Sequence, residues 1–197
     1  MITYGSILAV YFQATNLENY NGQRWYADAK FAANSLAIQY NLPVHTVAGV
    51  IAALSPNNRW ERNLLDAENL CKMYTMGGDL ESLKVSTYNA NRAKAIQILQ
   101  NHAPLDILGG LKVRAFYDCI VGGDSVCVDG HAYAIWTGQQ IPTTKTPKIS
   151  PKLYAQISAD YRIAADQINK ILGSNHTAAQ IQAITWLAWR RIISEIK

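Results

Sequence analysis

Asp129 is the residue whose surroundings in the sequence best suit it for chemistry. It follows the apolar segment Val126-Cys127-Val128 and precedes Gly130-His131-Ala132. An aspartate at this point is expected to cap the N-terminus of a helix, near the positive end of the helix dipole. A carboxylate held there can stabilise an oxocarbenium-like sugar as a glycosidic bond breaks, or deprotonate an attacking water or amine. A plain capping role is the alternative, so the neighbouring motifs decide between the two.

Two other residues are candidates to assist Asp129. His131 can orient a substrate or donate a proton, and a hydrogen bond to nearby backbone is the alternative. Glu61 follows Trp60 at an expected helix start, where it is either a second catalytic carboxylate or an ordinary first-turn charge. The candidate catalytic residues are therefore Asp129, His131 and Glu61.

The segment 108–116 has the pattern of a helix-hairpin-helix turn, because two glycines precede an apolar helix. In such a turn, backbone N–H groups at the start of the second helix bind a phosphate of DNA. Basic residues in the segment add positive charge, and basic residues in 87–95 are expected to approach the DNA backbone as well. A structural turn with solvated basic residues is the alternative. The candidate contacts with the DNA backbone are Gly109, Gly110, Lys112 and Arg114.

Asparagine, arginine and tryptophan are concentrated in the segment 53–63, between two expected helices. Amides can hydrogen-bond the edge of a base and an indole can stack on its face, which suits a pocket for an extruded nucleotide. The alternative is a turn in which Pro56 and the asparagines satisfy local backbone groups while Trp60 covers the core. The candidate contacts with a substrate base are Asn57, Asn58, Trp60, Asn63, Tyr88 and Tyr133.

The remaining motifs give no sign of a metal or a cofactor. The four histidines are scattered, and no phosphate-binding Walker loop or dinucleotide fingerprint is present. In the C-terminal helix, the spacing of Trp186 and Trp189 predicts a core face, and Arg190 with Arg191 is expected to form a solvated edge without a role in chemistry.

Apolar residues recur at intervals of three and four, which predicts an all-α chain. Pro43 is predicted at the first position of a helix, Asn89 as an N-cap, and Thr177 with Gln180 as a capping box. The proline- and threonine-rich loop 142–151 is expected to separate two lobes. The expected helices are 5–13, 23–41, 43–54, 60–75, 90–101, 110–121, 130–137, 151–172 and 178–196.

A length of 197 residues fits one domain of ordinary size or two small helical lobes that share a cleft, and we expect a single two-lobed helical domain over residues 1–197. Hydrophobic residues make up 49% of the 197 positions and charged residues 16%, which is typical of a compact globule. The net charge of +4 suits a polyanionic partner such as DNA but does not require one. Three cysteines without C-x-x-C spacing indicate a reducing cytosol, and neither export nor a membrane partner is expected. Composition specifies no oligomeric state.

Taken in chain order, these motifs resemble the helix-hairpin-helix DNA glycosylase superfamily, which includes endonuclease III. The resemblance covers about 43–138, from Leu54-Ser55 through the hairpin at 108–116 to Val128-Asp129-Gly130-His131. It implies a two-lobed all-α glycosylase fold, completed by N-terminal helices and residues 150–197. It also implies that Asp129, which matches the aspartate of the family's V-D-x-H motif, is catalytic.

The chain departs from that family in ways that bear on activity. Arg114 stands where bifunctional members carry a lysine, so the resemblance implies a monofunctional enzyme rather than a lyase. Lys112 replaces the second glycine of the usual hairpin turn, and no four-cysteine cluster for an iron–sulfur site follows. The chain is also similar to small bacteriophage proteins that share A-L-S-P-x-x-x-W-E-x-N and V-D-G-H-A, which implies an infected bacterial cell as its location.

Three interpretations of function stay open at this point. The first is DNA repair or modification by base excision, with the nucleotide extruded between Asp129 and the 55–63 turn. The second is transfer of an amine or other group onto a hypermodified pyrimidine in phage DNA, with Asp129 as base and Glu61 or His131 assisting. The third is a non-catalytic DNA-binding or inhibitory module on the same scaffold.

Overall fold

The computed structural model describes residues 4–195 and confirms the all-α prediction, because these residues form helices and loops without a strand. The helices belong to two compact units. Unit 1 joins the residues up to Tyr26 with those from Asp124 onward, and unit 2 is Ala27–Gly123. The loop 142–151 therefore lies inside unit 1, and the prediction that it separates two lobes is wrong. The first boundary instead falls within a continuous helix, α2 (Asn16–Gln39).

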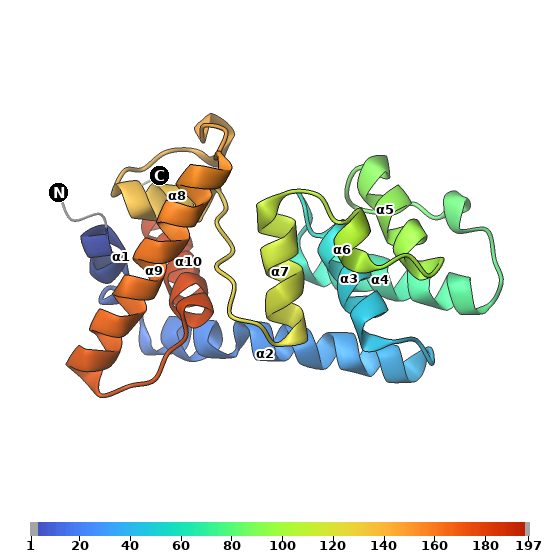
Figure 1. Cartoon of the computed structure of the whole chain (residues 1–197), viewed down its shortest axis with the longest axis horizontal. Coiled ribbons are helices and arrows are strands. Elements are labelled where there is room, and N and C mark those ends of the chain that lie inside the picture. The colour runs from blue at the N-terminus through green and yellow to red at the C-terminus, as the bar shows by residue number, and fades with distance from the viewer. Residues whose placement is uncertain (1–3, 196–197) are drawn as a thin grey trace. The chain divides into compact units, whose positions relative to one another are not determined.

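Unit 1 is a helical cluster in which α1 (Tyr4–Tyr11) and α10 (Ala178–Glu195) pack with each other and with both α8 (Gly130–Thr137) and α9 (Pro151–Leu172) (Figure 1). Helix α9 is amphipathic, since its buried residues recur every three or four positions and so form one face. These residues are Ile157, Tyr161, Ala164, Ala165 and Ile168. A short 3-10 helix, η2 (Thr143–Lys145), packs on α8.

Unit 2 is built around α3 (Val44–Leu54), in which every residue from 47 to 54 is buried. A helix that is apolar on all sides must be surrounded. Helix α3 contacts α4 (Trp60–Thr75), α5 (Asn89–Leu99), α6 (Pro104–Ile107) and α7 (Leu111–Val121) (Figure 1). The 3-10 helix η1 (Leu80–Ser82) joins α4 to the loop before α5.

Most predicted helices are confirmed, and three begin and end at the predicted residues: 60–75, 130–137 and 151–172. Two predicted cap positions are wrong by one residue. Pro43 is the N-cap of α3 rather than its first helical residue, and Tyr88 rather than Asn89 is the N-cap of α5. The short helix α6 and the 3-10 helices were not predicted, because a single turn carries no periodic signal.

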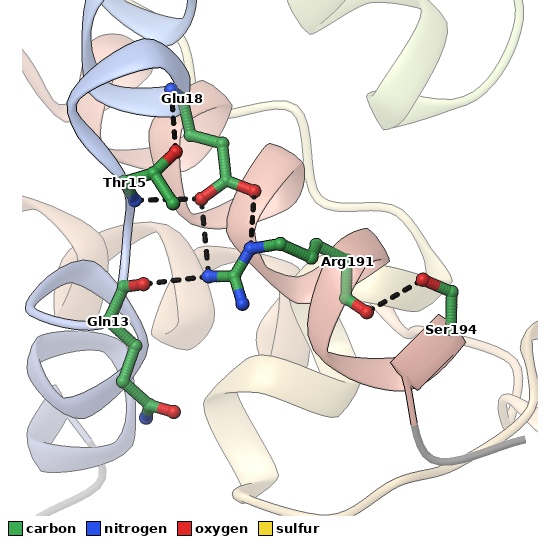
Figure 2. Close-up of polar contacts among 5 residues, drawn as sticks. All are labelled: Gln13, Thr15, Glu18, Arg191 and Ser194. Atoms are coloured by element: carbon green, nitrogen blue, oxygen red, sulfur yellow. Dashed lines mark hydrogen bonds and ion pairs between the residues drawn. The ribbon is translucent and has the colours of Figure 1, made fainter.

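The largest difference is the start of α2, which lies at Asn16 rather than at 23. A capping box explains it: Glu18 N–H donates to Thr15 Oγ1 at 3.2 Å, and Thr15 N–H donates to Glu18 Oε2 at 2.8 Å (Figure 2). The same reciprocal pair forms at the predicted capping box of α10, between Thr177 and Gln180. The asparagines and the glycine that follow Thr15 obscure this helix start in the apolar pattern.

Arg191 of α10 ties the start of α2 into unit 1. Its Nε lies 2.8 Å from Glu18 Oε1, and one of its terminal nitrogens donates to the backbone oxygen of Gln13 at 2.7 Å (Figure 2). Burial acts to raise the pKa of Glu18, but the hydrogen bonds from Arg191 and Thr15 hold it below the ordinary value of 4.5. The prediction that Arg191 belongs to a solvated edge is therefore wrong.

Acid should destabilise the protein partly through Glu18. Because its folded-state pKa lies below 4.5, ionised Glu18 stabilises the fold above that pH, and this contribution is lost as pH falls through the folded-state value. Glu18→Gln should therefore flatten the fall in the thermal unfolding midpoint between about pH 5 and about pH 3. Circular dichroism melts of both proteins across that range measure it.

The matched control is Glu81→Gln, which removes a carboxylate that is 67% exposed and 3.0 Å from Arg92. An exposed ion pair contributes little to stability, so this variant should follow the wild-type pH profile. If Glu81→Gln and Glu18→Gln flatten the profile equally, the Arg191 contact does not account for it.

Candidate functional site

Asp129 is the N-cap of α8, as predicted, and the structure shows what holds it there. Val126 and Val128 are both 2% exposed, which confirms a short buried link before the aspartate. The hydroxyl of Tyr154 donates to Val126 O at 2.7 Å and accepts from Val128 N–H at 3.2 Å. Asp129 Oδ1 then accepts the Ala132 N–H at 2.8 Å. The buried link before Asp129 and the start of α8 therefore both fix the position of the carboxylate, and Asp129 itself is half-buried.

Trp186 of α10 supplies a second donor to this carboxylate. Its indole Nε1–H donates to Asp129 Oδ2 at 3.2 Å. The indole is itself held on its sides, since the Trp25 ring lies 5.5 Å away and the Arg190 guanidinium lies 4.6 Å from the ring centroid. The prediction that Trp186 belongs only to a core face is incomplete, because it also fixes the candidate catalytic group.

The negative charge of Asp129 affects the pKa of Tyr161, a buried residue of unit 1. Burial raises the pKa of the Tyr161 phenol on α9, and the negative charge of Asp129 raises it further. Tyr161 therefore stays protonated in the physiological range and does not serve as a base.

The other two candidates of α8 have different ring neighbours. The His131 ring stands edge-on to Trp186, with centroids 6.3 Å apart and planes at 82°. Tyr133 packs against Trp136 instead, with centroids 6.1 Å apart. His131 is thus brought to the Asp129–Trp186 pair, whereas the ring of Tyr133 contacts Trp136. Both assignments stay predictions.

The loop 142–151 lies against the beginning of α8. A Cβ atom on Gly130 would sit 2.8 Å from Thr146 Oγ1 and 3.2 Å from the methyl group of Thr143, so a larger residue there would require the loop to shift. This close approach explains why glycine follows Asp129. It also shows that the loop, expected only as a connector, forms part of the surroundings of the candidate site.

In unit 2 a turn that contains Gly109 and Gly110 joins the four-residue helix α6 to α7, and its assignment as a DNA-binding hairpin stays a prediction. Helix α6 ends before Leu108, and α7 begins after Gly110, whose φ of 77° is in the region that favours glycine. The ammonium of Lys94 lies beside the turn, 3.5 Å from where a Cβ of Gly109 would be. Lys112 is exposed in the first turn of α7. Lys94 and Lys112 therefore both lie near the glycine turn, where the 11-residue helix α7 begins.

Arg114 differs from the other hairpin candidates because its guanidinium turns back onto the hairpin. Its Nε donates to Leu108 O at 2.8 Å, and a terminal nitrogen donates to Leu105 O at 2.7 Å. These carbonyls belong to α6 and the turn after it, so Arg114 fastens the two helices together. The geometry favours this holding role over a direct contact with phosphate.

The segment 55–63 forms a turn and the start of α4, and its candidate residues differ in how far they are exposed. Asn57 Nδ2 donates to the Tyr88 hydroxyl at 2.6 Å, and both residues are exposed. Glu61 is exposed in the first turn of α4. Trp60 is half-buried and meets the Phe116 ring of α7 edge-on, with centroids 6.3 Å apart. Trp60 thus joins the turn to the hairpin helix.

Asn58 and Asn63 face inward rather than outward. Asn63 is only 2% exposed, and its Nδ2 donates to Ile51 O at 3.1 Å. Asn58 Nδ2 donates to Leu54 O at 3.3 Å and to Asp66 Oδ2 at 3.0 Å. Both amides cap carbonyl groups at the end of α3, which favours a role in holding the turn over contact with a base.

Two negative findings concern the described part of the chain. Among residues 4–195 no three His, Cys, Asp or Glu side chains are grouped so as to hold a metal ion. Over the same residues, no helix has both the length and the apolarity needed to cross a bilayer.

These features define an all-helical protein with two compact units, a capped aspartate in one and a glycine hairpin in the other. The chain belongs to the family described as "Family of unknown function (DUF7178)", whose family model matches residues 3–192. No curated protein and no solved structure matches the chain.

Proposed function

We propose that the protein binds DNA and cleaves the N-glycosidic bond of an extruded base, with Asp129 as the essential carboxylate. The observation that carries this proposal is the setting of Asp129: two N–H donors fix it, both are neutral groups, and the residue is not sealed in the core. Its negative charge therefore remains available to a cation that develops on the sugar. Each oxygen also keeps a lone pair with which to orient a water.

The hairpin of unit 2 supports the DNA-binding half of the proposal. Backbone N–H groups at the start of α7 follow the Gly109–Gly110 turn, and Lys94 and Lys112 add positive charge there. A helix N-terminus with flanking cations favours a phosphate group. The net charge of +4 has the sign that DNA binding requires.

The proposed enzyme is monofunctional. A lyase needs an amine nucleophile at the sugar, whereas Arg114 carries a guanidinium that is bound to two backbone carbonyls. We therefore expect the reaction to stop at an abasic site, with water as the acceptor of the sugar.

A gel assay tests this proposal. End-labelled duplexes and single strands, each carrying one damaged or modified base, are incubated with the protein and analysed with and without hot alkali. Cleavage at the modified position only after alkali is the expected result. Strand cleavage without alkali would contradict the monofunctional assignment, and no abasic site on any substrate would contradict base excision.

Lys112 should contribute to DNA affinity through phosphate rather than through sequence. Lys112→Ala should weaken binding equally for different sequences and reduce the slope of log K against log salt by about 1. Fluorescence anisotropy of labelled duplexes at several salt concentrations measures both quantities.

The matched control for that prediction is Lys152→Ala, which removes an exposed lysine from the first turn of α9. It should leave the salt slope near the wild-type value. Equal losses in the two variants would show that binding follows net charge and not the hairpin.

A further inference from the structure

Asp66 of α4 is a buried carboxylate that receives hydrogen bonds from neutral groups alone. It is 6% exposed. Its Oδ2 accepts from Ser86 N–H at 2.7 Å and from Asn58 Nδ2 at 3.0 Å, and its Oδ1 has only the Ser86 hydroxyl at 3.5 Å. Burying a charge without a counter-charge is costly, so buried carboxylates are normally paired with a cation. Among the described residues, nothing supplies one.

Two amide oxygens beside Asp66 also have no hydrogen-bond donor. Asn58 Oδ1 and Asn63 Oδ1 are buried and without a partner, and the whole of Asn63 is only 2% exposed. Neither amide can be turned over to remove the problem, because each Nδ2 already donates to a backbone carbonyl of α3. A buried acceptor left without a donor is rare, and it points to a missing ligand.

These oxygens lie along one seam of unit 2. Asn63 and Asp66 are one turn apart on α4, so they share a face of that helix. Ile51 and Leu54, whose carbonyls bind the two amides, are likewise one turn apart at the end of α3. The end of a helix carries a partial negative charge. The seam therefore collects a carboxylate, two unbonded amide oxygens and a negative helix end.

We propose that this seam binds an alkali-metal cation, sodium or potassium, through Asp66 and the amide oxygens of Asn58 and Asn63. All the donors are oxygens, which excludes the softer metals that prefer thiolate or imidazole. A single carboxylate suits a singly charged ion. The two common divalent cations fit less well, because magnesium keeps several of its waters and calcium sites gain affinity from additional carboxylates. The site is independent of the catalytic proposal and pins the 55–63 turn to α3 and α4.

The test measures thermal unfolding of the full chain in sodium, potassium and choline chloride at equal ionic strength. Choline is too large to enter the buried seam, so its chloride serves as the reference without a bound ion. Because the ionic strength is the same in all three salts, general salt effects on stability cancel. A bound ion stabilises the folded state by mass action, and the midpoint should rise by about 2–4 °C in the chloride of the preferred alkali metal. Asp66→Asn should abolish the difference between the salts.

The control is Asp106→Asn, which removes an exposed carboxylate of the same unit and should keep the wild-type dependence. Equal midpoints of the wild type in all three salts would overturn the proposal, as would a dependence that survives Asp66→Asn. If Asp66→Asn does not fold, the site can be tested in crystals of the wild type grown with thallium(I), a singly charged ion that can be located by its anomalous scattering. An anomalous peak beside Asn63 Oδ1 supports the site, whereas an ordered water there, or no peak, contradicts it.

Discussion

Asp129→Asn should lower the rate of base excision by about 10²–10⁴-fold while DNA affinity stays near the wild-type value. Asparagine is as good an N-cap as aspartate, so the amide oxygen can still accept the Ala132 N–H and α8 should keep its start. What the substitution removes is the negative charge opposite the sugar. It also removes the acceptor for the Trp186 indole, at a cost of about 1 kcal/mol of stability.

Trp186→Phe is the matched control, because it breaks the same indole hydrogen bond but leaves the carboxylate in place. It should cost much less activity than Asp129→Asn, since the acid remains charged and capped. Single-turnover rates of the three proteins on one substrate give the comparison. Equal rates for Asp129→Asn and the wild type would remove Asp129 from the mechanism, and equal losses in the two variants would reduce its role to packing.

Gly22→Ala is the second change with a large expected effect, and it should destabilise the protein by about 1–3 kcal/mol or more. Gly22 lies in α2 where that helix meets α10 within unit 1. A Cβ there would lie 2.5 Å from Ile184 Cγ1, 2.6 Å from Ile184 Cα and 2.7 Å from Ile184 N. Because two of these atoms are backbone, no rotamer relieves the clash and the helices must move apart.

The sign of this effect makes it informative. In an unhindered helix, glycine to alanine stabilises by up to about 1 kcal/mol, because alanine is the better helix former. Gly5→Ala in α1 is the control, since a Cβ there would meet nothing within 4 Å. Urea unfolding of both variants should give opposite signs. A Gly22→Ala protein as stable as the wild type would contradict the close approach of α2 and α10.

The helical elements were largely predictable because their periodicity is local. Helix α9 shows this: an N-cap serine before a proline fixes its start, and Gly173, whose φ is 64°, fixes its end. The start of α2 is harder to predict, because the asparagines and the glycine that follow Thr15 resemble a loop even though Thr15 and Glu18 form a capping box. The glycine has a packing reason, namely contact with α10, which no local pattern contains.

The candidate site was predictable only where a residue's role depends on its neighbours in the chain. Asp129 as a cap and the Gly109–Gly110 turn follow from local sequence. Trp186 lies 57 residues from Asp129, so nothing in the helix pattern of α10 indicated that its indole binds that carboxylate. The inward turn of Asn58 toward Asp66 also depends on how α3 and α4 pack, which spacing alone does not encode.

Mass spectrometry of the products from modified DNA tests the central claim most directly, with wild type and Asp129→Asn incubated in parallel. We expect the wild type to release a free base and leave an abasic sugar, and Asp129→Asn to release almost none. A nucleoside that becomes heavier instead would show group transfer, and DNA that is bound by the wild type without any product would show a non-catalytic binding module. Either result would contradict Asp129 as the carboxylate of a base-excision enzyme.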